Sequence, residues 1–238
     1  MSADRSLLDN PVWHAFTGPQ ARLAVGTGRA RGFLPGVPPF FAIADTSEAA
    51  YRDLRAILGE ASEARLCRPR AEPVPPGWTK TFEKPLVQMV CARPPRPRPD
   101  APIQPLGPSD RADMVALAEA TRPGPFGPRS PEFGPYVGIR VDGRLVAMAG
   151  ERFRLPGFTE VSAICTLPAY RGRGYGGALM AHLMAAIFAR GETPFLHVFP
   201  DNPAKKLYEA MGFVERARPL VVWLAPDARS GEIAPGPI

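Results

Sequence analysis

Cysteine is scarce in this chain of 238 residues: Cys67, Cys91 and Cys165 are few, odd in number and far apart. This scarcity excludes a disulfide framework and is typical of proteins from a reducing compartment. No apolar run reaches the roughly 18 residues of a membrane-spanning helix, and the first ten residues lack the basic and apolar regions of a signal peptide. We therefore expect a cytoplasmic protein without a membrane partner.

Signatures of metal and nucleic-acid binding are also missing. The three histidines form no cluster with cysteines or acidic residues at metal-ligand spacing, so no metal site is expected. The formal net charge of +6 is consistent with an anionic partner. Many arginines, however, stand beside prolines, and no basic helix is interleaved with aromatic residues. These features favour an anionic small molecule over nucleic acid.

Proline, in contrast, is abundant, and its 31 residues cluster in connections between ordered segments. The clearest linker is the proline-rich stretch at 93–102, whose prolines favour a stiff, extended connection. It predicts an N-terminal α+β domain over residues 1–92 and a larger domain over 103–238. The N-terminal domain shows the apolar patterns of short strands and helices but no recognisable group of catalytic residues.

The second domain combines a long loop rich in proline and glycine, at 121–135, with a run of strand patterns. Alternating apolar residues predict three antiparallel strands at 136–141, 145–153 and 159–166. The elements expected after the next helix are a buried strand, a further helix and closing strands, at 194–199, 204–211 and 213–224. We therefore expect an α+β fold with a mixed, mostly antiparallel sheet flanked by helices.

A glycine-rich loop, RGRGYGG at 171–177, joins the third of these strands to the next helix. Apolar residues from Leu179 onward recur at helical spacing, and Gly191 ends that helix. Such a loop exposes backbone N–H groups at a helix N-terminus, where the helix dipole favours negative charge. Because Arg171 and Arg173 add charge-assisted contacts, the loop predicts a phosphate-binding site.

The same loop also contains the G-x-G-x-x-G pattern of dinucleotide-binding folds, at Gly172, Gly174 and Gly177. Asp201 stands near the expected place of a ribose-binding acid. Antiparallel hairpins, rather than strand–helix units, precede the loop, and too few residues follow it for a doubly wound sheet. The surrounding pattern therefore argues against a dinucleotide.

A longer set of residues matches a different pattern. Arg171-x-x-Gly174-x-Gly176 fits the acetyl-CoA signature Q/R-x-x-G-x-G/A, and Asn202 with the string at 207–213 fits the second half of the same family pattern. Together these residues resemble the GNAT superfamily of acetyl-CoA-dependent N-acetyltransferases.

The resemblance covers about residues 101 to 225 and implies the GNAT acyl-CoA N-acyltransferase fold. In that fold the strands at 159–166 and 194–199 splay apart to admit acetyl-CoA, which serves as a co-substrate. The smaller N-terminal domain has a similar order of elements, so a degenerate GNAT-like half is one interpretation of it. The residues that the resemblance assigns to the cofactor are Ile164, Cys165, Thr166, Arg171, Gly172, Arg173, Gly174, Tyr175, Gly176 and Asn202.

Acetyl transfer to an amine needs a group that removes a proton from the ammonium. The resemblance places that base at Glu160, and Glu151 is a rival. If the intervening hairpin turns symmetrically, Glu151 lies opposite Ser162 and on the same face as Glu160, whereas a one-residue slip would put it on the other face. Two solvated charges are the plainer alternative, and His197 is a further candidate base.

The departing thiolate needs an acid, and the resemblance places it at Tyr208, whose phenol stays protonated at neutral pH. Backbone N–H groups at 164–166 would stabilise the oxyanion. Cys165 is not expected to act as a nucleophile, because an apolar-flanked lone cysteine is usually part of the core.

These assignments predict an N-acetyltransferase that moves an acetyl group directly from acetyl-CoA to a primary amine of a small molecule or peptide. The amine would enter beside the loop at 121–135. A catalytically silent acyl-CoA sensor is an alternative from another class, and a dinucleotide-binding protein is the least favoured one. The acceptor and the oligomeric state are left open, with a homodimer as one alternative.

Overall fold

The structure is a computed structural model that describes residues 3–33, 40–59, 62–95 and 101–227. Its largest element is a seven-stranded sheet with the strand order β12-β6-β11-β10-β9-β8-β7. The strands are β6 (Val87–Val90), β7 (Ile103–Leu106), β8 (Tyr136–Val141), β9 (Arg144–Leu155), β10 (Phe158–Thr166), β11 (Thr193–Val198) and β12 (Val214–Ala217). β10 and β11 pair in parallel, and the other neighbours in this sheet pair antiparallel. The expected mixed, mostly antiparallel sheet is confirmed.

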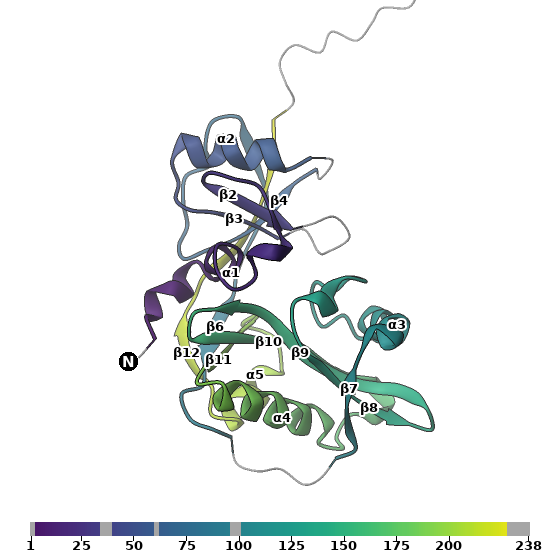
Figure 1. Cartoon of the computed structure of the whole chain (residues 1–238). Coiled ribbons are helices and arrows are strands. Elements are labelled where there is room, and N and C mark those ends of the chain that lie inside the picture. Colours follow the sequence, from purple (N-terminus) through teal and green to yellow (C-terminus); the bar gives the residue numbers. More distant parts are fainter. Residues whose placement is uncertain (1–2, 34–39, 60–61, 96–100, 228–238) are drawn as a thin grey trace, which may run out of the picture.

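Helices pack on this sheet, as Figure 1 shows for α4 (Tyr175–Ala189). Leu179, Met184 and Ile187 of α4 are fully buried in one core cluster with residues of β9 and β10. Their helical spacing places them on one side of the helix, which is why α4 lies along the sheet. Two further helices of this part are α3 (Arg111–Thr121) and α5 (Lys205–Ala210).

The N-terminal part forms an additional α+β unit, seen in the upper half of Figure 1. It contains one three-stranded sheet ordered β1-β2-β3 and another ordered β4-β13-β5. The elements are α1 (Pro11–Phe16), β1 (Ala24–Val25), β2 (Ala30–Phe33), β3 (Phe41–Ile43), α2 (Glu48–Ile57), β4 (Ala64–Arg68), β5 (Trp78–Pro85) and β13 (Leu220–Pro226). Ile43, Leu54 and Leu66 are buried in its core. Whether this unit is a degenerate GNAT-like half stays a prediction.

The two parts of the molecule exchange strands. β6, which precedes the expected linker, lies between β11 and β12 of the seven-stranded sheet. β13, from the end of the described chain, returns to the N-terminal unit and lies between β4 and β5. The division at 93–102 stays a prediction, with residues 96–100 outside the described part, and pairing crosses it in both directions.

The position of β13 predicts that the N-terminal unit depends on the last described strand. Leu224 is 4% exposed, so Leu224→Ala should lower the free energy of unfolding by about 2 to 4 kcal/mol, measured by urea denaturation. Val214→Ala in β12 is the control, because Val214 is 60% exposed and should change stability by less than about 0.5 kcal/mol. Equal stability of the two variants would contradict the core role of β13.

Candidate active site

The candidate site lies where β10 and β11 separate. The two strands are in parallel register over residues 158–160 of β10. Beyond that point the register of β10 with β9 is irregular between Ser162 and Cys165, and Ala163 there has a φ of 53°. A positive φ at a residue other than glycine is a strained feature that often accompanies functional sites. The strands therefore diverge in the expected place.

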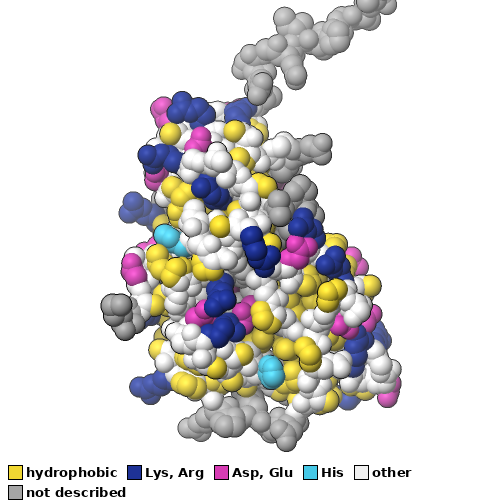
Figure 2. Space-filling view, in the orientation of Figure 1, with side chains coloured by type: hydrophobic (Ala, Val, Ile, Leu, Met, Phe, Trp, Pro, Cys, Tyr) yellow, Lys and Arg dark blue, Asp and Glu magenta, His cyan; other side chains and the backbone are white. Residues whose placement is uncertain are grey.

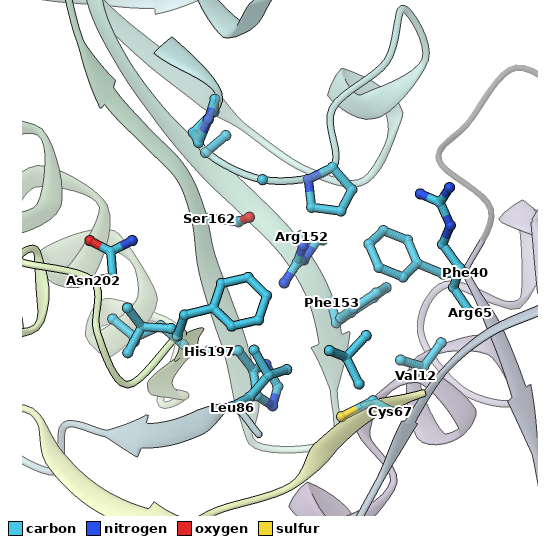
Figure 3. A pocket seen from close by; sticks show the side chains of 18 of the residues that line it. Val12, Phe40, Arg65, Cys67, Leu86, Arg152, Phe153, Ser162, His197 and Asn202 are labelled. Carbon is cyan, nitrogen blue, oxygen red and sulfur yellow. The ribbon is translucent and has the colours of Figure 1, made fainter. Parts of the chain in front are cut away.

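Their separation opens a cavity of about 370 Å³. Residues 161–164 of β10, residues 196–198 of β11 and the following Phe199 form one side of it. The other side belongs to the N-terminal unit and includes Phe40, Arg65, Cys67, Phe82 and Trp223. Figure 3 shows Asn202 at one end and Phe40 with Arg65 at the opposite end. The cavity is thus shared between the seven-stranded sheet and the N-terminal unit.

Glu160, the expected base, is fully buried next to this cavity. Nε and Nη2 of Arg152 each donate to its carboxylate at 2.7 Å, and Nδ1 of His197 lies 2.7 Å from Oε1. Burial alone would raise the pKa of Glu160, but Arg152 and His197 lower it to about 2. Because both carboxylate oxygens are engaged, Glu160 is not placed for direct contact with a substrate.

His197 connects Glu160 to a second polar group, the amide of Gln88 on β6. Oε1 of Gln88 accepts from Arg216 at 2.9 Å, and Nε2 donates to the carbonyl of Leu8 at 2.8 Å. The same Nε2 lies 3.1 Å from Nε2 of His197, which accepts when the ring is neutral. Burial lowers the pKa of His197, but its contacts with Cys67 and Glu160 raise it to about 9, which favours the protonated ring. The proton on Nδ1 then points to Glu160, and the ring is held from both sides.

The register of β9 and β10 corrects the expectation for Glu151. A symmetric hairpin would pair Glu151 with Ser162, but the strands shift register and Glu151 pairs with Val161. Its side chain therefore lies on the face opposite to Glu160. There it forms an ion pair with Arg190 at 2.8 Å, while burial raises its pKa. Glu151 does not line the cavity.

Tyr208, the expected acid, lines the cavity together with Ile164 and Asn202. Tyr208 is 8% exposed, and burial raises the pKa of its phenol to about 12. The phenol is therefore protonated over the whole neutral range. Asn202 is exposed, and its Oδ1 accepts from the N–H of Ala204 at 2.9 Å, which fixes the turn before α5.

The glycine-rich loop leads directly into α4, as expected. Gly172 and Gly174 have φ values of 78° and 79°, and Gly174 is the N-cap of the helix. No side chain caps this end of α4, so its first N–H groups point outward without a side-chain acceptor. Arg171 and Arg173 are exposed beside them, and Nε of Arg171 donates to the Thr166 carbonyl at 3.3 Å. This arrangement suits an anion.

The three cysteines are unbridged, as the sequence predicts. Burial raises the pKa of Cys165 to about 11, so its thiol is a poor nucleophile at neutral pH. Cys67 lines the cavity, and Figure 3 shows its sulfur pointing toward His197. Sequence reasoning missed Cys67, and it missed Arg152, because their roles depend on strand partners rather than on a local motif.

Three further observations bear on the binding partners. Among the described residues no group of histidine, cysteine and acidic side chains could hold a metal ion. None of the described helices is long and apolar enough to cross a bilayer. On the face shown in Figure 2, basic side chains are interspersed with acidic ones and form no continuous basic stripe.

Comparisons with known proteins agree with this geometry. The family described as FR47-like protein matches residues 136–223. The N-alpha-acetyltransferase RimI of Mycobacterium tuberculosis is 45% identical over 82 residues, which are 33% of this chain and 51% of RimI. The chain thus spans about half the length of that curated relative.

Two solved structures extend the similarity over nearly the whole chain. A crystal structure of a protein from Novosphingobium aromaticivorans, assigned to the GNAT family in its description, is 41% identical, with a TM-score of 0.85. That match covers 93% of this chain and 99% of the other. A GCN5-related N-acetyltransferase from Kribbella flavida shares the fold at 22% identity, with a TM-score of 0.62 over 97% and 98% of the two chains.

The buried ion pair of Glu160 with Arg152 predicts a pH-dependent loss of stability. Glu160→Gln leaves Arg152 without its carboxylate and should cost about 3 to 5 kcal/mol at pH 7. The folded pKa of about 2 lies below the ordinary value of 4.5, so the stabilisation is present above about pH 4.5 and is lost as the pH falls toward 2.

The stability difference between the wild-type protein and Glu160→Gln should therefore shrink by about 3 kcal/mol between pH 5 and pH 2, followed by urea denaturation. Glu209→Gln is the control, because Glu209 pairs with Lys205 while 51% exposed and should cost less than about 0.5 kcal/mol. A difference that stays constant with pH would contradict the depressed pKa of Glu160.

Proposed function

The chain belongs to the GNAT superfamily and is an acetyltransferase of that type, and we propose that it transfers the acetyl group of acetyl-CoA directly to a primary amine. The observation that carries the proposal is the cavity between β10 and β11, because β10 leads directly into the glycine-rich loop and the N-terminus of α4, which no side chain caps. The name of the RimI relative, an N-alpha-acetyltransferase, supports an amine as the acceptor.

The loop before α4 suits the pyrophosphate of coenzyme A. Positive φ values at Gly172 and Gly174 turn backbone N–H groups outward at the start of the helix. Arg171 and Arg173 add two positive charges. Tyr175 and Gly176 begin the helix itself, and a Cβ at Gly176 would touch Leu207 and Ile164 at ordinary distances.

The pantetheine arm would then follow β10 into the cavity, where Ile164, Asn202 and Tyr208 meet. The pairing of β10 with β9 skips Ala163 and Ile164, and the pairing of β10 with β11 ends at Glu160. Backbone N–H groups in this stretch are therefore candidates to stabilise the oxyanion, together with those of Cys165 and Thr166. One such donor is typically worth about 10² to 10³ in rate.

Each step of the transfer then has a group to assist it. The amine nitrogen attacks the thioester carbon, the carbon–sulfur bond breaks, and Tyr208 gives its proton to the departing thiolate. The proton that the amine nitrogen sheds restores the phenol through solvent. Because burial keeps the phenol protonated, Tyr208 is ready to donate at neutral pH.

In this scheme Glu160 is not a base that contacts the amine. Its carboxylate is ionised, fully buried and held by Arg152 and His197. It therefore acts as a positioning residue that fixes these two side chains at the cavity. The amine then enters as the free base, since an arginine-lined cavity disfavours an ammonium ion.

Cofactor binding predicts a thermal shift that depends on Gly174. Acetyl-CoA at about 100 times its Kd should raise Tm by roughly 5 °C or more, and NAD should not. Gly174→Asp should abolish the shift, because it strains a φ of 79° and puts a carboxylate where the phosphates bind.

Gly143→Asp is the matched control for this experiment. Gly143 also has a φ of 79°, and no atom lies within 4 Å of a Cβ built there, as at Gly174. The backbone strain is therefore comparable, but the site is the turn between β8 and β9. A shift that survives Gly174→Asp, or stabilisation by NAD alone, would rule out the proposed cofactor site.

The acid role of Tyr208 predicts a kcat effect with unchanged binding. Tyr208→Phe should lower kcat with acetyl-CoA and a panel of amines by about 100-fold, with little change in the KM for acetyl-CoA. Because the phenol pKa is about 12, activity should not fall through tyrosine ionisation below about pH 10.

Tyr170→Phe is the control, since Tyr170 lies outside the cavity lining and faces Arg173. Equal kcat in Tyr208→Phe and the wild-type protein would remove Tyr208 as the acid. Tight binding of acetyl-CoA without turnover of any amine would instead favour the acyl-CoA sensor. The observation that favours this alternative is the engagement of the Glu160 carboxylate by Arg152 and His197.

A further inference from the structure

The end of the cavity built by the N-terminal unit is aromatic and positively charged. Phe40, Phe82 and Trp223 line it, and Phe153 of β9 contributes a further ring. Its lining contains arginines but no aspartate, glutamate or lysine. Figure 3 shows this end, marked by Phe40 and Arg65, across the cavity from Asn202. An acceptor in this space would meet flat apolar surfaces and guanidinium groups.

The arginines of the lining differ in how they are neutralised. Arg152 is matched by the Glu160 carboxylate. Arg65 and Arg122 form no ion pair or hydrogen bond with another side chain in the described part of the chain. A partly buried charge without a counter-ion, such as that of Arg65, is costly and is normally paired, whereas Arg122 is exposed. The cavity therefore holds positive charge that an anionic ligand would neutralise.

Arg65 is held in one orientation by a stack of aromatic rings. Its guanidinium carbon lies 4.2 Å from the centroid of Trp223, and Trp223 stacks on Phe82 at 4.5 Å with an interplanar angle of 28°. Nε of Arg65 and Nε1 of Trp223 are buried without a hydrogen-bond partner among the described residues. A stacked, planar guanidinium loses little entropy when it binds a carboxylate.

Arg122 stands where the loop at 121–135 begins. It ends α3 in the left-handed conformation, with a φ of 49°, and its N–H donates to the Ala118 carbonyl at 2.7 Å. The next residues, Pro123, Gly124 and Pro125, also line the cavity. The expected acceptor loop therefore brings a second arginine to the same space.

We propose that the acceptor is an apolar amine of about the size of one aromatic ring that also carries a carboxylate, with Arg65 as the carboxylate-binding residue and Arg122 as a second cation. The proposal rests on the proposed function, because it names the acceptor class of that same cavity. An amine without an anionic group would bring no negative charge to these arginines. A carboxylate on the same molecule gains a charge-assisted, bidentate contact instead.

The test compares matched amines that differ only in the carboxylate. The pairs are phenylalanine with phenethylamine, and 4-(aminomethyl)benzoate with benzylamine, which place the carboxylate near the amine or beyond the ring. Release of CoA thiol is measured at saturating acetyl-CoA. At least one carboxylate-bearing amine should exceed its partner in kcat/KM by about 10-fold or more.

Single-residue variants identify the arginine that binds the carboxylate. Arg65→Gln should remove most of this preference, mainly through a higher KM for the carboxylate-bearing amine, so that the two members of a pair differ by less than about threefold. Arg122→Gln is a second variant at an exposed position, and it should reduce the preference as well. Arg31→Gln is the control: the guanidinium of Arg31 also lies over a tryptophan, Trp13, at 5.2 Å, but outside the cavity lining.

Other outcomes overturn the proposal in distinguishable ways. Equal use of both members of each pair, or faster acetylation of a peptide amide with a free N-terminus, refutes the acceptor class and leaves acetyl transfer to amines standing. An unchanged preference in both Arg65→Gln and Arg122→Gln refutes the assigned residues. Binding of acetyl-CoA without turnover of any of these amines refutes the acceptor class, and failure of the wider amine panel as well contradicts the proposed function.

Discussion

The short parallel pairing of β10 with β11 is the constraint on which the rest of the structure depends. The strands pair over residues 158–160 of β10 and then diverge, although each stays paired on its outer side. β9 holds β10 through Thr166, and β6 holds β11 through Val198. These outer ladders pair one edge of each strand, whereas the inner edges beyond Glu160 of β10 have no partner strand among the described residues, which leaves the space for the cavity between them.

The strand exchange makes the N-terminal unit part of the site. β6 carries Gln88 into the seven-stranded sheet, where it contacts His197. β13 carries Trp223 in the other direction, where it stacks on Arg65. The two sides of the cavity are therefore built together, with segments from both parts of the chain. This is a physical reason for an acetyltransferase domain to retain the additional unit.

Local sequence patterns predicted most elements of the fold and the position of the glycine-rich loop. The Asp142–Gly143 turn, the helical spacing after Gly177 and the glycines at 172 and 174 are short-range signals, and the structure has the hairpin, the helix and the loop where they were expected. The partners of β6 and β13 were not predicted, because strand pairing between distant segments leaves no local pattern.

The details of the site show the same limit. Glu151 lies on the face opposite to Glu160 because the β9–β10 register shifts by one residue. Such an irregularity has no sequence signature, so it could not be predicted. Glu160 was assigned from its position in the family pattern. Its contacts with Arg152 and His197 could not be predicted, because they need β9, β10 and β11 to lie side by side. Arg65 carries no motif at all, and its stack with Trp223 joins residues far apart in the sequence.

A crystal structure of the protein with coenzyme A and 4-(aminomethyl)benzoate would test the central claim most directly. The account predicts the pyrophosphate at residues 171–176, the pantetheine arm between β10 and β11, and the benzoate carboxylate at Arg65. Coenzyme A bound away from the opening between these strands would contradict the account. So would an amine ligand bound with its carboxylate in solvent.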